Sequence, residues 1–134
     1  MTKQSWFLVT AAVGLTPIAL AYGAAPSISV PALYGVAVED VSTTHILRAV
    51  MDLYLAMVVF WLMGARREAL RLPALYSVVV FMLGLAAGRA LSLVVDGMPS
   101  PLLVVYLVLE IGFGVVGILL ARSQPQGGEP AQES

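Results

Sequence analysis

Four long apolar segments fill most of this chain and constrain its fold more than any other feature. They cover about residues 6–25, 44–63, 73–95 and 101–121. A transmembrane helix needs about 20 predominantly apolar residues, because each adds about 1.5 Å toward the ~30 Å of the hydrocarbon core. With 60% hydrophobic and only 11% charged residues, the chain is far more apolar than a soluble domain. We therefore predict an all-α fold, an integral membrane four-helix bundle over residues 1–122.

The two ends of the chain are interpreted separately. Residues 123–134 are small and polar, so they cannot bury a core and are predicted to form a disordered tail. The first apolar segment is open to a second interpretation, a signal peptide. Lys3 would give it a short basic region, and Ala19-Leu20-Ala21 would serve as a cleavage motif. The length of the apolar run favours a retained helix; three spans would remain if it were cleaved.

The basic residues are distributed unevenly between the predicted helices. Arg66, Arg67 and Arg71 lie in the short second loop, Lys3 precedes the first helix, and Arg122 follows the fourth. The other two loops contain acidic residues and neither lysine nor arginine. By the positive-inside rule, both termini are predicted to be cytoplasmic.

Composition excludes several classes of chemistry. The absence of cysteine excludes disulfides, zinc–thiolate sites and thiol catalysis, and a single histidine excludes a multi-histidine metal site within one chain. A net charge of −1 provides no basic surface for nucleic acid. The sequence also lacks a phosphate-binding glycine loop, a nucleophile elbow and an H-E-x-x-H motif. We therefore predict no metal, no cofactor and no nucleic-acid partner.

Four ionisable residues interrupt the apolar segments: Arg48, Asp52, Arg89 and Glu110. A charged residue at the bilayer centre costs about 2.5–3.5 kcal/mol on insertion scales, so such residues usually face a protein interior. Because the helices alternate in direction and rise about 1.5 Å per residue, all four charges fall in the outer half of the membrane. We predict that they form a charge cluster, which acts either as an interhelical clasp or as a binding site.

Helical phase predicts how these charges pair. Arg48 and Asp52 share one face of the second helix at a spacing of four residues, so they can pair within it. Arg89 is expected to bind Glu110 across the third and fourth helices, with Tyr106 supplying a hydroxyl, because a guanidinium suits buried carboxylate pairs. The polar residues predicted near this cluster are His45, Ser92, Asp96 and Tyr106.

Small and aromatic residues suggest how the helices pack and where they meet the membrane surface. Gly84-x-x-x-Gly88 forms a small-residue seam on the third helix, either against another helix of the chain or against a second copy. Gly114 and Gly117 share the face of Glu110 on the fourth helix and are also predicted to pack closely. Aromatic residues near the helix ends are predicted to anchor in the membrane interfaces. They are Trp6, Tyr22, Tyr34, Trp61 and Tyr76.

Several short motifs resemble those of a known family. They are Leu47-Arg48-Ala49, Gly88-Arg89 with Ser92, Asp96-Gly97-x-Pro99-Ser100, and Glu110. The family comprises small bacterial four-helix membrane proteins catalogued only as a domain of unknown function. The resemblance covers about residues 6–122 and implies a bacterial inner-membrane location with no established activity. It does not extend to Asp52, so the Arg48–Asp52 pair is a weaker expectation than the Arg89–Glu110 pair.

Three functions remain open. The first is an accessory, assembly or structural subunit in the lipid bilayer, either a small homo-oligomer or the partner of another membrane protein. The second is a carrier or receptor for a small anionic or lipid-like ligand, bound by Arg48 and Arg89 and controlled by protonation of Glu110. The third is an enzyme that isomerises a lipid by acid–base chemistry at His45, Asp52 or Glu110. We favour the first, non-enzymatic function, because no motif in the sequence indicates catalysis.

Overall fold

The apolar segments form helices in the structure, a computed structural model that describes residues 1–123. The long helices are α1 (Lys3–Gly23), α3 (Val41–Arg66), α4 (Glu68–Val95) and α5 (Pro101–Ser123), and a short helix, α2 (Pro26–Tyr34), follows α1. Each of the four long helices is long and apolar enough to cross a membrane. The predicted all-α, four-span architecture is therefore confirmed for the described residues.

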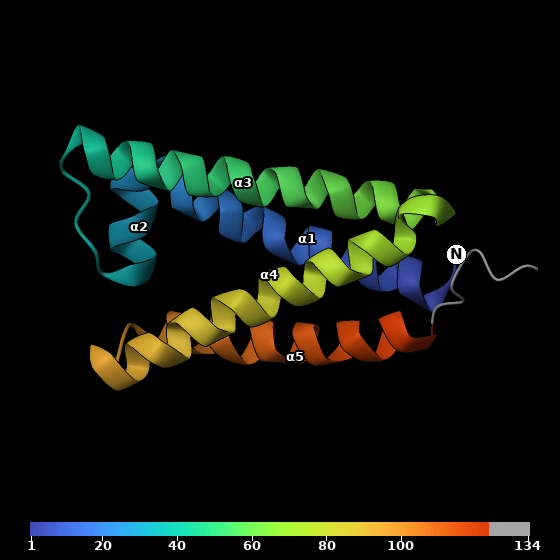
Figure 1. The fold of residues 1–134 in the computed structure, drawn as a ribbon. Coiled ribbons are helices and arrows are strands. Elements are labelled where there is room, and N and C mark those ends of the chain that lie inside the picture. The colour runs from blue at the N-terminus through green and yellow to red at the C-terminus, as the bar shows by residue number, and fades with distance from the viewer. Residues whose placement is uncertain (124–134) are drawn as a thin grey trace, which may run out of the picture.

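The long helices alternate in direction along the bundle (Figure 1). α1 lies beside α3, while α4 crosses the bundle and packs along α5. The α3–α4 connection lies at the same end as the N-terminus, and α2 and the α4–α5 turn lie at the opposite end, here called the α2 end. Gln4 Nε2 donates to Ser123 Oγ at 3.2 Å, so the first and last helices meet away from the α2 end. Ser123 is thus helical, contrary to prediction, and the rest of the predicted tail lies outside the described residues.

The core is built around a small-residue face of α1. Ala11, Ala12 and Ala19 are almost fully buried, which lets the neighbouring helices approach the α1 backbone. At Gly23 an added Cβ would lie only 2.5 Å from Met51 Cβ on α3. Such close packing is typical of membrane helices, because lipid provides no hydrophobic drive between them.

α3 and α4 are joined by a single residue, Arg67. α4 begins at Glu68, before the predicted segment of about residues 73–95, so Pro73 lies inside the helix. The proline removes one backbone hydrogen bond near the helix start. Arg66 and Arg71 are likewise helical rather than in a loop, and Arg71 Nη2 donates to a carbonyl at the end of α3 at 3.3 Å.

The short helix α2 was not predicted. It begins at Pro26, because proline favours the first helical position, and it ends at Tyr34, followed by the C-cap Gly35, whose φ of 71° suits glycine. A second proline, Pro31, lies inside the helix. Ser29 Oγ donates to the carbonyl of Ala21 at 2.5 Å, which fixes α2 against the end of α1. α2 therefore runs across one end of the bundle (Figure 1).

Candidate functional site

Arg89 on α4 and Glu110 on α5 form the ion pair expected between these helices. Arg89 Nε lies 2.9 Å from Glu110 Oε1 and 3.0 Å from Oε2, so both carboxylate oxygens accept from one nitrogen. The two side chains are only 21% and 8% exposed. Hydrogen bonds between ionised groups are shorter and stronger than neutral ones, so this contact joins α4 firmly to α5.

Tyrosines extend this ion pair to two further helices. Arg89 Nη2 donates to Tyr22 Oη on α1 at 3.4 Å, and its guanidinium carbon lies 5.6 Å from the centre of the Tyr106 ring on α5. The hydroxyls of Tyr34 on α2 and Tyr106 are 2.8 Å apart, and the Tyr22 and Tyr34 rings stack with centroids 5.2 Å apart. The expectation that Tyr106 supplies a hydroxyl to Arg89 was wrong, because Tyr106 presents its ring and Tyr22 supplies the hydroxyl. We call Arg89, Glu110, Tyr22, Tyr34 and Tyr106 the Arg89 cluster.

Sequence reasoning missed Tyr22 and Tyr34, which it assigned to the membrane interface. Both residues lie at the same end of the predicted bundle as Arg89, and this position could have indicated that they contact it. Trp61, also predicted to be an interfacial anchor, is fully buried, and its Nε1 donates to Ser77 Oγ at 2.9 Å. These aromatic side chains pack inside the bundle because their rings bury well and their polar atoms find partners there.

Arg48 and Asp52 do not belong to the Arg89 cluster. Arg48 Nη1 donates to the carbonyl of Gly23 at 3.0 Å, at the end of α1, where helical carbonyls lack intrahelical donors. Asp52 is exposed on α3. The expected Arg48–Asp52 ion pair is absent from the described residues, in which Arg89 and Glu110 form the one salt bridge. The predicted cluster of four charges is thus reduced to a single pair.

The other predicted site residues lie near the α2 end without bonding to the cluster. His45 is exposed, one turn before Arg48 on α3. Ser92 Oγ donates to Asp96 Oδ2 at 2.6 Å, so these two satisfy each other at the exposed end of α4. Asp96 also opens the turn between α4 and α5, where Gly97 has a φ of 100° that favours glycine. Among the described residues, no hydrogen bond joins His45, Ser92 or Asp96 to Arg89.

Two groups at the α2 end, outside the spanning helices, have shifted pKa values. Burial, reinforced by the hydrogen bond to Tyr106, raises the pKa of Tyr34 well above that of an ordinary phenol. The hydroxyl and amide of Thr43 hold the pKa of Asp40 below its usual value, and Thr43 N donates to Asp40 Oδ1 at 2.7 Å. Tyr34 is therefore a neutral hydroxyl at neutral pH, and Asp40 is a carboxylate that caps α3.

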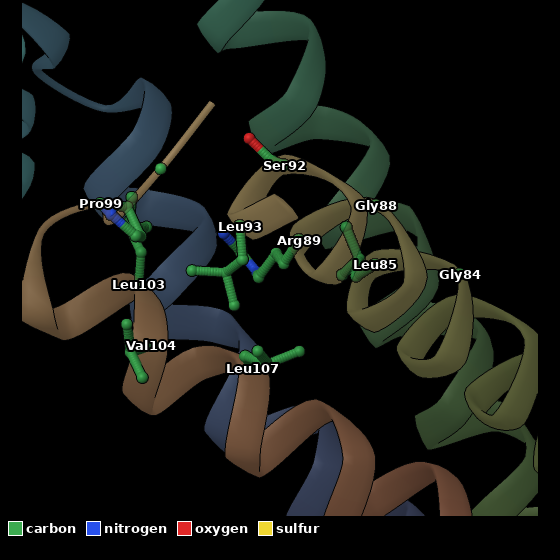
Figure 2. Close-up of a pocket in the computed structure, with 11 residues that line it drawn as sticks. Gly84, Leu85, Gly88, Arg89, Ser92, Leu93, Pro99, Leu103, Val104 and Leu107 are labelled. Atoms are coloured by element: carbon green, nitrogen blue, oxygen red, sulfur yellow. The ribbon is translucent and has the colours of Figure 1, made fainter. Parts of the chain in front are cut away.

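A cleft of about 330 Å³ opens beside Arg89, between α4 and α5 (Figure 2). Gly84 and Gly88 form part of its wall, and a Cβ added to either would meet nothing within 4 Å. Within residues 1–123 this seam therefore makes no close contact with another helix, and packing against a second copy stays a prediction. By contrast, Gly114 and Gly117 face α4 so closely that an added Cβ would overlap its side chains. The other residues that line the cleft are mostly apolar and include Leu85, Leu103, Val104 and Leu107.

The arrangement favours holding helices together or binding an amphiphile. Arg89 lines the cleft on one side and, together with Glu110, a second cavity of about 70 Å³ between α1, α3, α4 and α5 on the other. It is the one charged side chain in the cleft, where it could meet an anionic group beside an apolar wall. Within residues 1–123 there is no group of three or more histidine, aspartate or glutamate side chains that could hold a metal ion.

Comparison with known proteins identifies the family of the chain. Neither a curated protein nor a solved structure matches it. A family model matches residues 4–121. This range covers the five helices almost completely and includes every member of the Arg89 cluster. The resemblance seen in the sequence to a domain of unknown function is thereby confirmed. The chain belongs to the family described as domain of unknown function DUF4345.

Proposed function

We propose that this protein is a small non-enzymatic membrane protein, an accessory, assembly or structural subunit, in which the Arg89–Glu110 pair clasps α4 to α5. The observation that carries this proposal is that the polar atoms of Arg89 and Glu110 contact other helices of the same chain. Both carboxylate oxygens of Glu110 are occupied by Arg89, and Arg89 also donates to Tyr22 on α1. These polar atoms are used to join helices of the same chain, and the Glu110 side chain is only 8% exposed.

We propose further that the protein is a multi-pass protein of the bacterial inner membrane with both termini in the cytoplasm. Four helices are long and apolar enough to cross a membrane, and the family resemblance supports a bacterial inner membrane. The basic residues near the helix ends gather at the end of the bundle opposite α2, which the positive-inside rule assigns to the cytoplasm. They are Lys3, Arg66, Arg67, Arg71 and Arg122.

The clasp is tested by removing and exchanging its charges. Breaking a buried ion pair from one side costs about 3–5 kcal/mol, which is a large part of the stability of a typical domain. Arg89→Ala and Glu110→Ala are therefore expected to lower the yield of folded protein after mild detergent extraction and size-exclusion chromatography. The exchange of Arg89→Glu with Glu110→Arg should restore part of that yield. Glu39→Ala, which removes an exposed acid, is the control.

The proposed clasp would be contradicted by two single variants that fold as well as wild type and melt at the same temperature. A loss in both single variants without recovery in the exchanged variant would show that the residues matter separately, and would also contradict the pairing.

A second candidate function is a receptor for an amphiphile with an anionic head, and the cleft beside Arg89 favours it. Its volume of about 330 Å³ and its mostly apolar wall suit a short acyl chain, with Arg89 facing the head. Since Arg48 does not line this cleft, the candidate depends on Arg89 alone. Gly88→Leu should fill the cleft without disturbing the fold, because the added side chain starts in open space.

Laurate binding to the purified protein by isothermal titration calorimetry tests this candidate. We expect wild type to bind and Gly88→Leu not to bind at equal folded yield. Absence of binding by wild type, or equal binding by both proteins, would refute it and leave the clasp proposal unaffected.

A further inference from the structure

One face of α3 carries an acid for which residues 1–123 provide no basic partner. Asp52 is exposed, and Arg48, one turn earlier and also exposed, donates instead to the carbonyl of Gly23. Among the acidic residues of the described chain, Asp52 alone lies exposed near the middle of a helix that could cross a membrane. Its position therefore needs an explanation outside the folded chain.

The depth of Asp52 makes contact with lipid unfavourable. At about 1.5 Å per residue, it lies roughly 16 Å from the start of α3 at Val41 and about 21 Å from its end at Arg66. An acidic side chain at such a depth usually faces protein or a water-filled cavity and finds a partner there. No helix of the described chain covers this side chain, so a partner would come from another molecule.

The residues around Asp52 have the pattern of a helix–helix interface. Spacings of four and three residues alternate along it, which is the repeat of two parallel helices packed with a small crossing angle. Small side chains on either side of Asp52 would let a second backbone approach closely. All residues of this face are exposed; they are His45, Ala49, Asp52, Ala56 and Val59, here called the Asp52 face.

We propose that the Asp52 face binds the same face of a second copy of this chain, and that Arg48 of each copy donates to Asp52 of the other. Charge complementarity argues for this occupant, because Asp52 lies on the face and Arg48, a base one turn earlier, lies beside it. Two copies in one membrane have the same orientation, and a two-fold axis along the membrane normal brings their faces together at equal depth. Each Arg48 then pairs with an Asp52, and no charge faces lipid.

The guanidinium of Arg48 has enough donors for this role. A guanidinium has five N–H donors, and the Gly23 carbonyl takes one of them at Nη1. The cleft wall at Gly84 and Gly88 lacks this complementarity, since Arg89 beside it is already paired with Glu110. The dimer interface is therefore assigned to α3. It is independent of the clasp between α4 and α5.

Single introduced cysteines can test the interface, because the chain contains none. Ala49→Cys and Ala56→Cys place a thiol on the Asp52 face, and Ala87→Cys on α4 is a matched control. Ala87 is also exposed, and it lies as many residues before Val95, the end of α4, as Ala49 lies after Val41, the start of α3. Each variant is reconstituted at low density in vesicles of phosphatidylethanolamine and phosphatidylglycerol and oxidised with copper phenanthroline.

We expect the two α3 variants to form disulfide-linked dimers at least ten times faster than Ala87→Cys. Equal rates at the three positions would overturn the proposal. A monomer in vesicles that cross-links at Ala56→Cys only in native membranes, to a species of another mass, would also overturn it, in favour of a different protein on this face.

The proposed charge pairing is tested separately in the Ala56→Cys background. Asp52→Arg leaves an arginine at both positions 48 and 52 of each copy and should reduce the cross-linking rate at least ten-fold, whereas adding Arg48→Asp restores opposite charges and should recover it. Failure of this recovery, in protein whose buried Trp61 shows native fluorescence, would overturn the pairing. Folded yield distinguishes the two proposals, since Asp52→Leu should leave it unchanged while Arg89→Ala lowers it.

Discussion

The contact of α1 with α3 at Gly23 should tolerate no larger residue. An alanine Cβ would lie 2.5 Å from Met51 Cβ, 2.9 Å from the Leu47 carbonyl oxygen and 3.1 Å from Arg48 Cα. Carbon atoms in contact are normally about 3.5–4.0 Å apart, so the two helices would have to separate locally by about 1 Å. None of these atoms is the end of a flexible side chain. Overpacking of this kind typically costs about 1–3 kcal/mol, and we expect about 2 kcal/mol for Gly23→Ala.

Gly14→Ala provides the control on the same helix. Its Cβ would meet nothing within 4 Å, and Ala is favoured over Gly inside a helix by up to about 1 kcal/mol, so this variant should be as stable as wild type or more stable. Reversible unfolding in mixed micelles by SDS can be followed through the buried Trp61 in a Trp6→Phe background. Free energies of unfolding that agree within about 0.5 kcal/mol for the two alanine variants would refute the packing argument, since that is the usual scatter of surface substitutions.

Three further predictions concern single polar contacts. Ser77→Ala should lower the free energy of unfolding by about 1–3 kcal/mol in the same assay, because it leaves the fully buried indole N–H of Trp61 without its acceptor; an unchanged value would contradict this. Burial raises the folded-state pKa of Tyr34, so its contribution is complete below the unfolded phenol pKa of about 10 and declines as pH rises above it. As pH rises in the alkaline range, the free energy of unfolding should therefore fall less steeply in Tyr34→Phe than in wild type. Parallel curves for the two proteins would show that Tyr34 does not cause the loss. The Thr43 hydrogen bonds lower the folded-state pKa of Asp40, so the cap is complete above the unfolded pKa of about 3.9 and is lost as pH falls through the folded value. Hydrogen exchange should show less protection of the Thr43 amide in Asp40→Ala at neutral pH, and no further loss in that variant on acidification.

The spans could be predicted from the sequence because lipid imposes one requirement on every residue that crosses it. A spanning segment must be apolar and must satisfy its own backbone, whichever way it faces, so hydropathy alone finds the four long helices. α2 escaped this reasoning because it is short and begins with a proline that is also common in loops. The start of α4 was misplaced for a related reason, since Pro73 is tolerated inside that helix.

The site could be predicted only in part. The sequence shows which residues share a face of a membrane helix, but not whether that face points into the protein or toward lipid. Tyr106 and Glu110 share a face of α5, and that face is buried. Arg48 and Asp52 share a face of α3 by the same reasoning, but that face is exposed. In a soluble protein an apolar stripe marks the inward face, whereas lipid is as apolar as the core and removes this signal. Tyr22 was assigned to the interface because it is an aromatic residue near a helix end.

The single residue between α3 and α4 divides the molecule into two parts, one with α1, α2 and α3 and the other with α4 and α5. The most extensive helix contacts are α1 with α3 and α4 with α5, so each half of the chain on either side of Arg67 contains one closely packed pair. The continuous chain mainly keeps the halves at a high effective concentration. Residues 1–66 and 68–134, produced as separate chains in one membrane, would therefore retain the principal packing surfaces, and Arg89 with Tyr22 would be a contact by which one half recognises the other.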